Sequence, residues 1–168
     1  FYLAWQDNFH WDGEFSSLFD DAAQPVNGHI EMAESFNGVI DKLQKDASYR
    51  KQFKKIFRTS FISPEHVLKA LAQFTGTLTS ANSKYDRYKK GTASYTAQEE
   101  DGYQLFLTHC NSCHKEPLFT DYSLRNIGLP VESFLNDYGK LMLTKDPSDS
   151  LKFKVPTLRN VYISSNYM

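Results

Sequence analysis

Two cysteines and a histidine form the motif whose spacing most directly prescribes a chemistry. The run Thr108-His109-Cys110-Asn111-Ser112-Cys113-His114 contains the pattern C-x-x-C-H, and the chain holds 2 cysteines in all. Two thiols one helical turn apart can add to the two vinyl groups of one haem, while the adjacent imidazole ligates the iron. The motif therefore predicts covalent haem c on Cys110 and Cys113, with His114 as a metal ligand.

Three other uses of this pattern stay open at the level of the residues. A thioredoxin-like dithiol would follow a strand in a βαβ unit, and the local sequence lacks one. A zinc site has too few good ligands unless both His109 and His114 join the two cysteines. A surface disulfide is the third alternative. Haem attachment is the interpretation that we carry forward.

Helical periodicity covers the first half of the chain. Apolar residues recur at helical spacing over residues 33–45 and in a second segment that Asp46 can cap. The pair Ser63-Pro64 is a good N-cap and first helical position, and an apolar stripe follows it to about Ser80. Strand signals are scarce, so the sequence predicts an all-α fold.

The chain changes character on either side of the cysteine motif. Residues 82–95 are polar and predict a short helix plus a linker, with a domain boundary near residue 92. Thr96 and Glu99 form a capping box that opens a helix running into the motif. After His114, prolines and glycines are spaced as expected of backbone that wraps a prosthetic group. Five side chains are candidates to line a haem, although ordinary packing explains each equally well: Phe106, Phe119, Leu129, Phe134 and Tyr138.

Composition excludes several classes of partner. The 168 residues carry a net charge of -1, so no global field favours nucleic acid or an anionic membrane. No run of apolar residues is long enough for a membrane span, and no signal peptide is recognisable. Aromatic residues make up 15% of the chain, so the core must be built around flat, bulky groups.

Several runs of residues together resemble one family. They are His10-Trp11-Asp12-Gly13, Ser17-Leu18, Pro25, Glu31-Met32, Leu78 to Ser83, Tyr85-Asp86-Arg87-Tyr88, Gly102-Tyr103-Gln104-Leu105-Phe106, the haem motif, Phe119-Thr120-Asp121, Asn126-Ile127-Gly128-Leu129 and Phe153-Lys154-Val155-Pro156-Thr157-Leu158-Arg159-Asn160. In this order they resemble the bacterial di-haem cytochrome c peroxidases over essentially the whole chain.

The resemblance implies a fold made of parts of two cytochrome c-like haem domains. Residues 1–92 would form the C-terminal part of the N-terminal, peroxidatic domain, and residues 93–168 a truncated C-terminal, electron-transfer domain. The first C-x-x-C-H and the distal histidine of the peroxidatic haem are then expected upstream of Phe1, and the distal ligand of the second haem beyond Met168. We therefore expect the chain to be the middle of a longer protein, and unable by itself to hold the peroxidatic haem covalently.

The resemblance also gives two residues a catalytic role. Glu31 matches the acid beside the peroxidatic haem, where a carboxylate can take the proton from one peroxide oxygen and deliver it to the other. Trp11 matches the tryptophan between the two haems, which offers a route for an electron. The structural alternatives are a Glu stabilised by a helix dipole and a buried aromatic anchor. Asp21 stands where the family usually has glutamine, so the hydrogen bonding around peroxide is expected to differ.

Other ligands are less determined. Met142 and Met168 could each serve a lone cytochrome c as distal ligand, but the resemblance places neither in that role. Three basic residues could pair with haem propionates or simply form a solvated basic face: Lys152, Lys154 and Arg159. The family also holds a calcium between domains, partly through backbone carbonyls that correspond to Ser164 and Asn166, and an intact calcium site is doubtful here.

The expected function is reduction of hydrogen peroxide to water, with electrons from a small c-type cytochrome or cupredoxin. The alternatives are a single-haem electron carrier and a di-haem oxidase of a protein side chain. Covalent haem attachment normally takes place in an oxidising compartment, so the periplasm is the expected location. No nucleic-acid partner is expected, and a homodimer is compatible with the resemblance.

Overall fold

The computed structural model describes residues 2–163, which form two compact units. The first, the helical unit, comprises Leu3–Trp5 and Phe15–Leu78. The second, the motif unit, comprises residue 2, Gln6–Glu14 and residues 79–163, and it contains the cysteine motif. The predicted boundary at residue 92 concerns haem domains, whereas these units are defined by chain contacts alone, so that boundary stays a prediction.

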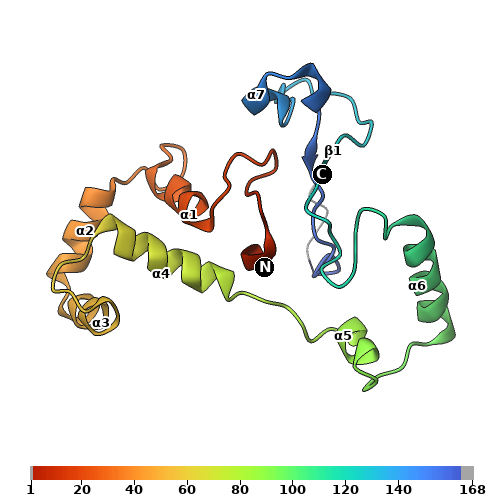
Figure 1. Cartoon of the computed structure of the whole chain (residues 1–168), viewed down its shortest axis with the longest axis horizontal. Coiled ribbons are helices and arrows are strands. Elements are labelled where there is room, and N and C mark those ends of the chain that lie inside the picture. Colours follow the sequence, from red (N-terminus) through yellow and green to blue (C-terminus); the bar gives the residue numbers. More distant parts are fainter. Residues whose placement is uncertain (1, 164–168) are drawn as a thin grey trace. The chain divides into compact units, whose positions relative to one another are not determined.

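The helical unit consists of the 3-10 turn η1 (Leu3–Trp5) and four α-helices, α1 (Leu18–Asn27), α2 (Phe36–Lys45), α3 (Ala47–Phe57) and α4 (Pro64–Gly76). Helix α4 packs against α1 and also contacts η1 and α2, as Figure 1 shows for its red-to-yellow part. The buried apolar side chains of this unit are Val26, Ile40, Ile62, Val67 and Leu68.

Side-chain caps explain where these helices begin. The Asp46 carboxylate accepts hydrogen bonds from the backbone N–H groups of Ser48 and Tyr49 at 2.7 and 3.2 Å, and so starts α3 as predicted. Ser63 caps α4, with Pro64 as its first residue, which is also confirmed. Helix α2 begins at Phe36 rather than at residue 33, because Ala33 adopts the left-handed conformation, with φ of 51°, and Ser35 provides the cap.

Helix α1 has no counterpart among the predicted elements. Ser17 caps it by accepting a hydrogen bond from the Asp20 N–H at 3.1 Å, and Asp20 and Asp21 stand in its first turn. Pro25 lies inside the helix and breaks the pattern of good helix formers. Ser17 and the two acids indicate a helix start in the sequence, but the proline argues against a helix at this place.

The motif unit has three α-helices and little other regular structure. Helix α5 (Lys84–Lys89) and helix α6 (Ala97–His109) confirm the predicted short helix and the helix that leads into the motif. The capping box is present, since Glu99 N–H donates to Thr96 Oγ1 and Thr96 N–H donates to Glu99 Oε2. The chain after His114 is mostly loop, as predicted.

Short elements organise that loop-rich segment. Strands β1 (Leu124–Arg125) and β2 (Phe153–Lys154) pair antiparallel, and α7 (Leu141–Thr144) and η2 (Pro147–Asp149) lie between them in the chain (Figure 1). Gly139 has a φ of 59°, and a Cβ there would lie 2.5 Å from the Lys152 carbonyl oxygen. Only glycine therefore lets these two stretches of backbone come so close. Overall the described chain is mostly helical, which confirms the all-α prediction.

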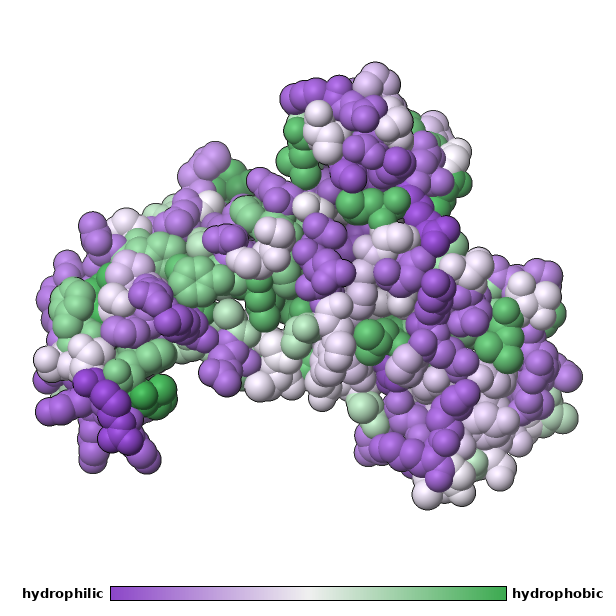
Figure 2. Space-filling model, viewed as in Figure 1, coloured by the Kyte–Doolittle hydropathy of each residue, from purple (hydrophilic) through white to green (hydrophobic). Residues whose placement is uncertain are grey.

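Apolar side chains remain at the surface of the helical unit. Figure 2 shows green, apolar surface over its helices, and the exposed side chains include Ile56 on α3 and Phe74 on α4. Within residues 2–163, no helix combines the length and apolar character that crossing a bilayer requires.

Ile62 offers a test of the core of the helical unit. Its side chain is 1% exposed, so Ile62→Ala should lower the free energy of unfolding by about 2–5 kcal/mol through lost burial and a residual cavity. Urea denaturation measures the change. Ile56→Ala is the matched control, because Ile56 is 68% exposed and its loss should change stability by less than about 0.5 kcal/mol. Equal effects of the two substitutions would contradict the packing described.

Candidate functional site

The cysteine motif begins where α6 ends. Cys110 is the C-cap residue, and its N–H donates to the Phe106 carbonyl at 2.8 Å. The Cys110 carbonyl in turn accepts from the N–H groups of Cys113 at 3.2 Å and His114 at 2.9 Å, so the motif continues as one further turn. Both thiols are free, Cys110 at the surface and Cys113 half-buried. The two sulfurs thus project from a single turn that His114 closes.

The orientation of His114 is set by backbone carbonyls. Its Nδ1 lies 3.2 Å from the Phe119 oxygen and 3.1 Å from the Pro156 oxygen. A carbonyl can only accept, so Nδ1 must carry the proton and the neutral ring keeps its lone pair on Nε2. A hydrogen bond of this kind on the second ring nitrogen is the usual support for a metal-bound histidine.

The residues of the motif fit a covalently attached haem. Two free thiols in one turn provide the attachment points, and a histidine with Nε2 available provides an axial ligand. Among residues 2–163 no group of three or more His, Cys, Asp or Glu side chains is arranged so that it could hold a metal ion.

Two segments that contact His114 lie alongside each other: residues 117–125 and residues 153–159. Strands β1 and β2 pair at one end. Further along, Thr157 Oγ1 donates to the Leu118 carbonyl at 2.5 Å, and the buried Thr120 hydroxyl donates to the main chain of the other segment at 2.5 Å. The two carbonyls that accept from His114 belong one to each segment, so this pairing fixes the orientation of the ring.

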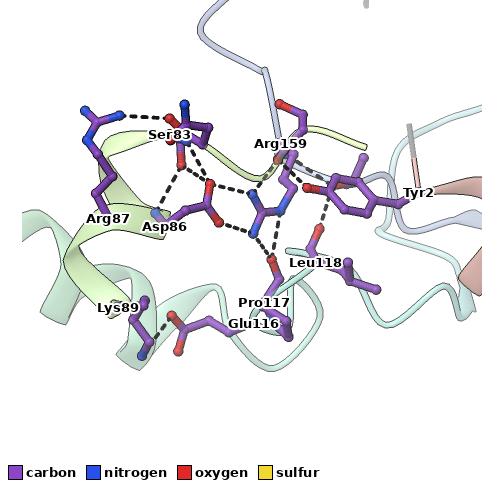
Figure 3. A network of polar contacts seen from close by, with 12 residues as sticks. Tyr2, Ser83, Asp86, Arg87, Lys89, Glu116, Pro117, Leu118 and Arg159 are labelled. Atoms are coloured by element: carbon purple, nitrogen blue, oxygen red, sulfur yellow. Dashed lines mark hydrogen bonds and ion pairs between the residues drawn. The ribbon is translucent and has the colours of Figure 1, made fainter. Parts of the chain in front are cut away.

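A buried ion pair holds these segments to α5. The Arg159 guanidinium donates to both carboxylate oxygens of Asp86, at 2.9 and 3.1 Å, and the two side chains are only 7% and 10% exposed. The same guanidinium donates to the carbonyls of Pro117, at 2.6 and 2.9 Å, and Ser80, at 2.8 Å. Ser83 completes the carboxylate's partners through its N–H and hydroxyl (Figure 3). Every strong donor and acceptor of the pair is therefore used.

Aromatic rings surround the guanidinium. Its central carbon lies 5.1 Å from the centroid of Tyr2, 5.6 Å from Tyr85 and 5.5 Å from Phe119. Cation–π attraction adds to the ion pair at these distances. Arg159 is thus neither a free partner for a haem propionate nor part of a solvated basic face. Hydrogen bonds from Arg159 and Ser83 lower the pKa of Asp86 to about 2, against the opposing effect of burial.

Sequence reasoning missed this ion pair. Asp86 and Arg159 both fall within runs quoted for the family resemblance, but neither run says that the two side chains meet. The sequence offered one indication: an acidic and a basic residue each stand in a run of residues that is typical of the family.

A cavity of about 430 Å³ lies beside the motif. Phe106 and Phe119, two of the predicted lining residues, border it together with Tyr85, Leu158 and Arg159. Its lining does not include the motif residues Cys110, Cys113 and His114. The other predicted lining residues are exposed: Leu129 at 61%, Phe134 at 88% and Tyr138 at 37%. Contact of these five with a haem stays a prediction.

Trp11 belongs to the motif unit. Its carbonyl accepts a hydrogen bond from the Lys154 N–H at 2.6 Å, which attaches the Gln6–Glu14 segment to β2. The side chain is 41% exposed, so Trp11 is not the buried anchor that was its structural alternative. Its role in electron transfer stays a prediction.

Glu31 belongs to the helical unit, in the turn between α1 and α2. Backbone hydrogen bonds attach this turn to the end of α1, including those from Glu31 N–H to the Gly28 carbonyl at 3.0 Å and from Met32 N–H to the Pro25 carbonyl at 3.2 Å. The carboxylate lies against Gly28, where an added Cβ would be 2.6 Å from Glu31 Oε2. Glu31 is exposed and precedes the first turn of α2, so the helix-dipole alternative does not apply.

Several remaining candidates are distributed elsewhere. Met142 is 50% exposed on α7, whereas Met168, Ser164 and Asn166 lie outside the described residues. Lys152 pairs with Asp149 at 2.9 Å, and Lys154 donates to Gln6 Oε1 at 2.9 Å. These two lysines are therefore engaged within the protein rather than forming a solvated basic face.

Comparison with protein families assigns the chain. Residues 1–94 match the family model described as di-haem cytochrome c peroxidase. The chain belongs to the di-haem cytochrome c peroxidase family. This confirms the resemblance drawn from the sequence runs.

Curated relatives of this family include both peroxidases and MauG proteins. Cytochrome c peroxidase Ccp of Escherichia coli is 36% identical over 94% of this chain and 35% of its own length. Methylamine utilization protein MauG of Paracoccus denitrificans is 34% identical over 94% of the chain and 48% of its length. Cytochrome c551 peroxidase of Nitrosomonas europaea is 32% identical, with the same coverages of 94% and 48%. The chain thus spans half or less of these relatives.

Solved structures of di-haem proteins share the fold. A MauG-like protein associated with microbial copper homeostasis matches with a TM-score of 0.89 and 26% identity, over 98% of this chain and 55% of that one. The diheme peroxidase BthA from Burkholderia thailandensis matches with a TM-score of 0.76 and 22% identity, over 96% and 47%. These similarities confirm a cytochrome c-like, mostly helical fold.

The Asp86–Arg159 pair predicts a specific loss of stability in acid. The pKa of Asp86 is about 2 in the fold, below the ordinary Asp value of 3.8, so its contribution to stability is present above about pH 4 and is lost as the pH falls through about 2. Urea denaturation from pH 5 to pH 2 should show this loss, on the order of 2 kcal/mol. Asp86→Asn should lower stability by about 3–5 kcal/mol at neutral pH, because it leaves Arg159 buried without a counter-charge, and should remove this part of the pH dependence.

Asp101→Asn is the matched control, since Asp101 is exposed on the neighbouring helix α6. It should leave both the stability and its pH dependence close to those of the unsubstituted protein. An unchanged pH dependence in Asp86→Asn would contradict the assignment of the acid-sensitive contribution to this pair.

Proposed function

We propose that this chain is part of an enzyme that reduces hydrogen peroxide to water with electrons from a small donor protein, a c-type cytochrome or a cupredoxin. The observation that carries the proposal is His114. It ends a C-x-x-C-H motif, its Nδ1 is held by two backbone carbonyls, and its Nε2 is left for iron, in a chain of the di-haem cytochrome c peroxidase family.

Haem c would be held by thioether bonds to Cys110 and Cys113 and by coordination to His114. When bound, it supplies an iron centre that exchanges single electrons. The chain's own residues orient the ligand: the carbonyls of Phe119 and Pro156 fix the imidazole, and the Asp86–Arg159 pair holds the segments that carry them. In the proposed domain division, residues 93–168 belong to this electron-transfer haem and residues 1–92 to the peroxidatic domain.

Glu31 would manage the proton of the peroxide. Cleavage of the O–O bond requires a proton to leave one oxygen and reach the other, and an accessible carboxylate can accept and then donate it. Glu31 is exposed, and the hydrogen bonds of its turn fix the backbone position from which the side chain extends. Trp11 would carry electrons between the two haem sites of the complete protein.

Oxidation of a protein side chain is the second candidate function. It stays a candidate because the relatives are not all named as peroxidases: a methylamine utilization protein MauG is 34% identical, and a MauG-like protein shares the fold. The family description and the peroxidase names among the relatives favour peroxide reduction. The third alternative, a single-haem carrier, has no counterpart among the relatives described above.

The location and further ligands follow from the same proposal. In the periplasm an unmodified pair of thiols would oxidise, and covalent haem attachment would consume both thiols. The proposed attachment therefore suits a periplasmic protein. A calcium ion between domains, with carbonyls of Ser164 and Asn166 among its ligands, and a homodimer belong to the complete protein and remain proposals for it.

Haem attachment is tested by the pyridine haemochrome spectrum of the protein as it occurs in the cell, produced with the cytochrome c maturation machinery. We expect a c-type spectrum that survives acid extraction, because thioether bonds are covalent. The double substitution Cys110→Ala and Cys113→Ala should remove one haem equivalent per chain. Ser112→Ala, between the two cysteines, is the control and should retain it. Full haem content in the double variant would defeat the proposal.

Peroxide turnover tests Glu31. Glu31→Gln keeps the shape of the side chain but cannot relay a proton, so kcat with a reduced donor cytochrome should fall by about 10²–10⁴-fold. Stopped-flow measurement of donor oxidation gives the rate. Glu65→Gln, an exposed acid of α4 in the same unit, should leave it unchanged. A haem-loaded protein that shows no peroxide turnover at all would favour the side-chain oxidase instead.

A further inference from the structure

Four tyrosines of the motif unit form one cluster of rings. Tyr85 and Tyr88 come from α5, Tyr95 from the linker after it and Tyr103 from α6. Tyr103 lies at the centre, with its ring centroid 6.5 Å from Tyr85, 6.0 Å from Tyr88 and 5.8 Å from Tyr95. Tyr88 and Tyr95 are stacked almost parallel, at 3.9 Å and 8°. Each ring therefore has a neighbouring tyrosine close enough for an electron to pass between them.

The cluster is continuous with the haem-binding motif. The ring of Tyr85 meets Phe119 edge-on at 4.6 Å, and Phe119 supplies one of the two carbonyls that accept from His114 Nδ1. A path of rings and one hydrogen bond thus runs from His114 through Phe119, Tyr85 and Tyr103 to the stacked pair.

The stacked pair also has a proton acceptor. The Tyr88 hydroxyl donates to Glu100 Oε2 at 3.2 Å, while Glu100 Oε1 accepts from Gln104 at 3.0 Å. A phenol that loses an electron becomes a strong acid, so oxidation of a tyrosine is easier when a base already accepts its proton. Stacking against Tyr95 lets two rings share the electron deficiency.

Cations disfavour the other two tyrosines as resting places for positive charge. Lys89 Nζ lies 5.9 Å from the Tyr85 centroid and 5.6 Å from the Tyr103 centroid, and Arg159 lies 5.6 Å from Tyr85. Tyr103 does donate to Glu116 at 2.8 Å, but Lys89 donates to the same phenolic oxygen at 3.1 Å. A nearby cation makes removal of an electron from a ring costlier. Tyr88 stacks on the ring of Tyr95 and donates to the Glu100 carboxylate, which offsets the electrostatic effect of Lys89 on it.

We propose that Tyr88 and Tyr95 form a redox site that supplies an electron to a haem bound at His114 and holds the oxidising equivalent as a tyrosyl radical when the external donor is absent. This inference rests on the proposed function, because peroxide is the oxidant and the haem is the acceptor of the electron.

The electron and proton balance is simple. Reduction of one hydrogen peroxide to two waters consumes two electrons and two protons. Tyr88 would supply one of these electrons, which travels by Tyr103, Tyr85 and Phe119 to the haem site, and the phenolic O–H breaks as its proton passes to Glu100. The second electron would come from the haem centre, and the two protons from solvent. The products at the pair are a neutral tyrosyl radical and a neutral carboxylic acid. An electron from the donor protein and return of the proton restore both groups.

Electron paramagnetic resonance tests the site in the haem-loaded protein. After peroxide is mixed without donor and the sample is frozen rapidly, we expect a tyrosyl signal. Tyr88→Phe and Glu100→Gln should each reduce it about tenfold or more, since the first removes the phenolic hydroxyl and the second replaces the carboxylate that accepts its proton with an amide that cannot. Tyr49→Phe, on α3 of the helical unit, is the control and should keep the full signal.

A second arm does not depend on haem or peroxide. Flash photolysis generates tris(bipyridine)ruthenium(III) in solution as the oxidant, and phenoxyl absorption reports the yield in the wild-type and Tyr88→Phe proteins. Loss of the signal in Tyr88→Phe supports the pair as the redox site even if peroxide turnover fails. Equal yields in the two proteins overturn it.

The two arms separate failure of the redox site from failure of the proposed function. A protein that carries haem and reduces peroxide, yet gives no tyrosyl signal or the same signal in Tyr88→Phe, overturns the redox site and leaves the peroxidase proposal standing. A signal that disappears in Tyr103→Phe but persists in Tyr88→Phe also overturns it, because the radical would then rest on Tyr103.

Discussion

Arg159 carries a permanent positive charge into the interior of the motif unit, and a buried guanidinium must find acceptors for its N–H groups. It finds them on the Ser80 carbonyl and on Asp86 of α5, which are close in the chain, and on the Pro117 carbonyl, which is far from both and from Arg159. Satisfying one charge therefore fixes three pieces of backbone relative to one another. The residues that follow Pro117 include Phe119, whose carbonyl accepts from His114, so the geometry of the proposed haem ligand depends on this pair.

Two kinds of constraint position the two candidate sites. Around His114, the buried Asp86–Arg159 ion pair and the paired loop segments hold the backbone in place, and removal of either charged side chain would leave the other unpaired. Around Glu31, local backbone hydrogen bonds attach a turn to the end of α1, and the side chain is exposed to water. The first arrangement suits a ligand that must not move. The second suits a group that has to gain and release a proton.

Much of the fold could be predicted because its signals are local. Asp46, Ser63 and Thr96 cap helices with their own side chains, and the C-x-x-C-H motif defines its chemistry within five residues. The Asp86–Arg159 pair and the contact of His114 with the Pro156 carbonyl could not be predicted, since each joins segments more than forty residues apart and no local pattern encodes that meeting. Helix α1 was missed for the opposite reason, because a proline inside it contradicts the local pattern.

The two carbonyls that accept from His114 lie near opposite ends of the loop-rich segment in the sequence. Phe119 follows the histidine by five residues, and Pro156 lies shortly before Arg159. In an extended chain neither constraint acts, and the imidazole could place its proton on either nitrogen. The tautomer that leaves Nε2 ready for iron is thus selected by tertiary structure and not by C-x-x-C-H itself. The proposed attachment points, Cys110 and Cys113, lie within one local turn, whereas His114 acquires its orientation only when the distant segment closes against it.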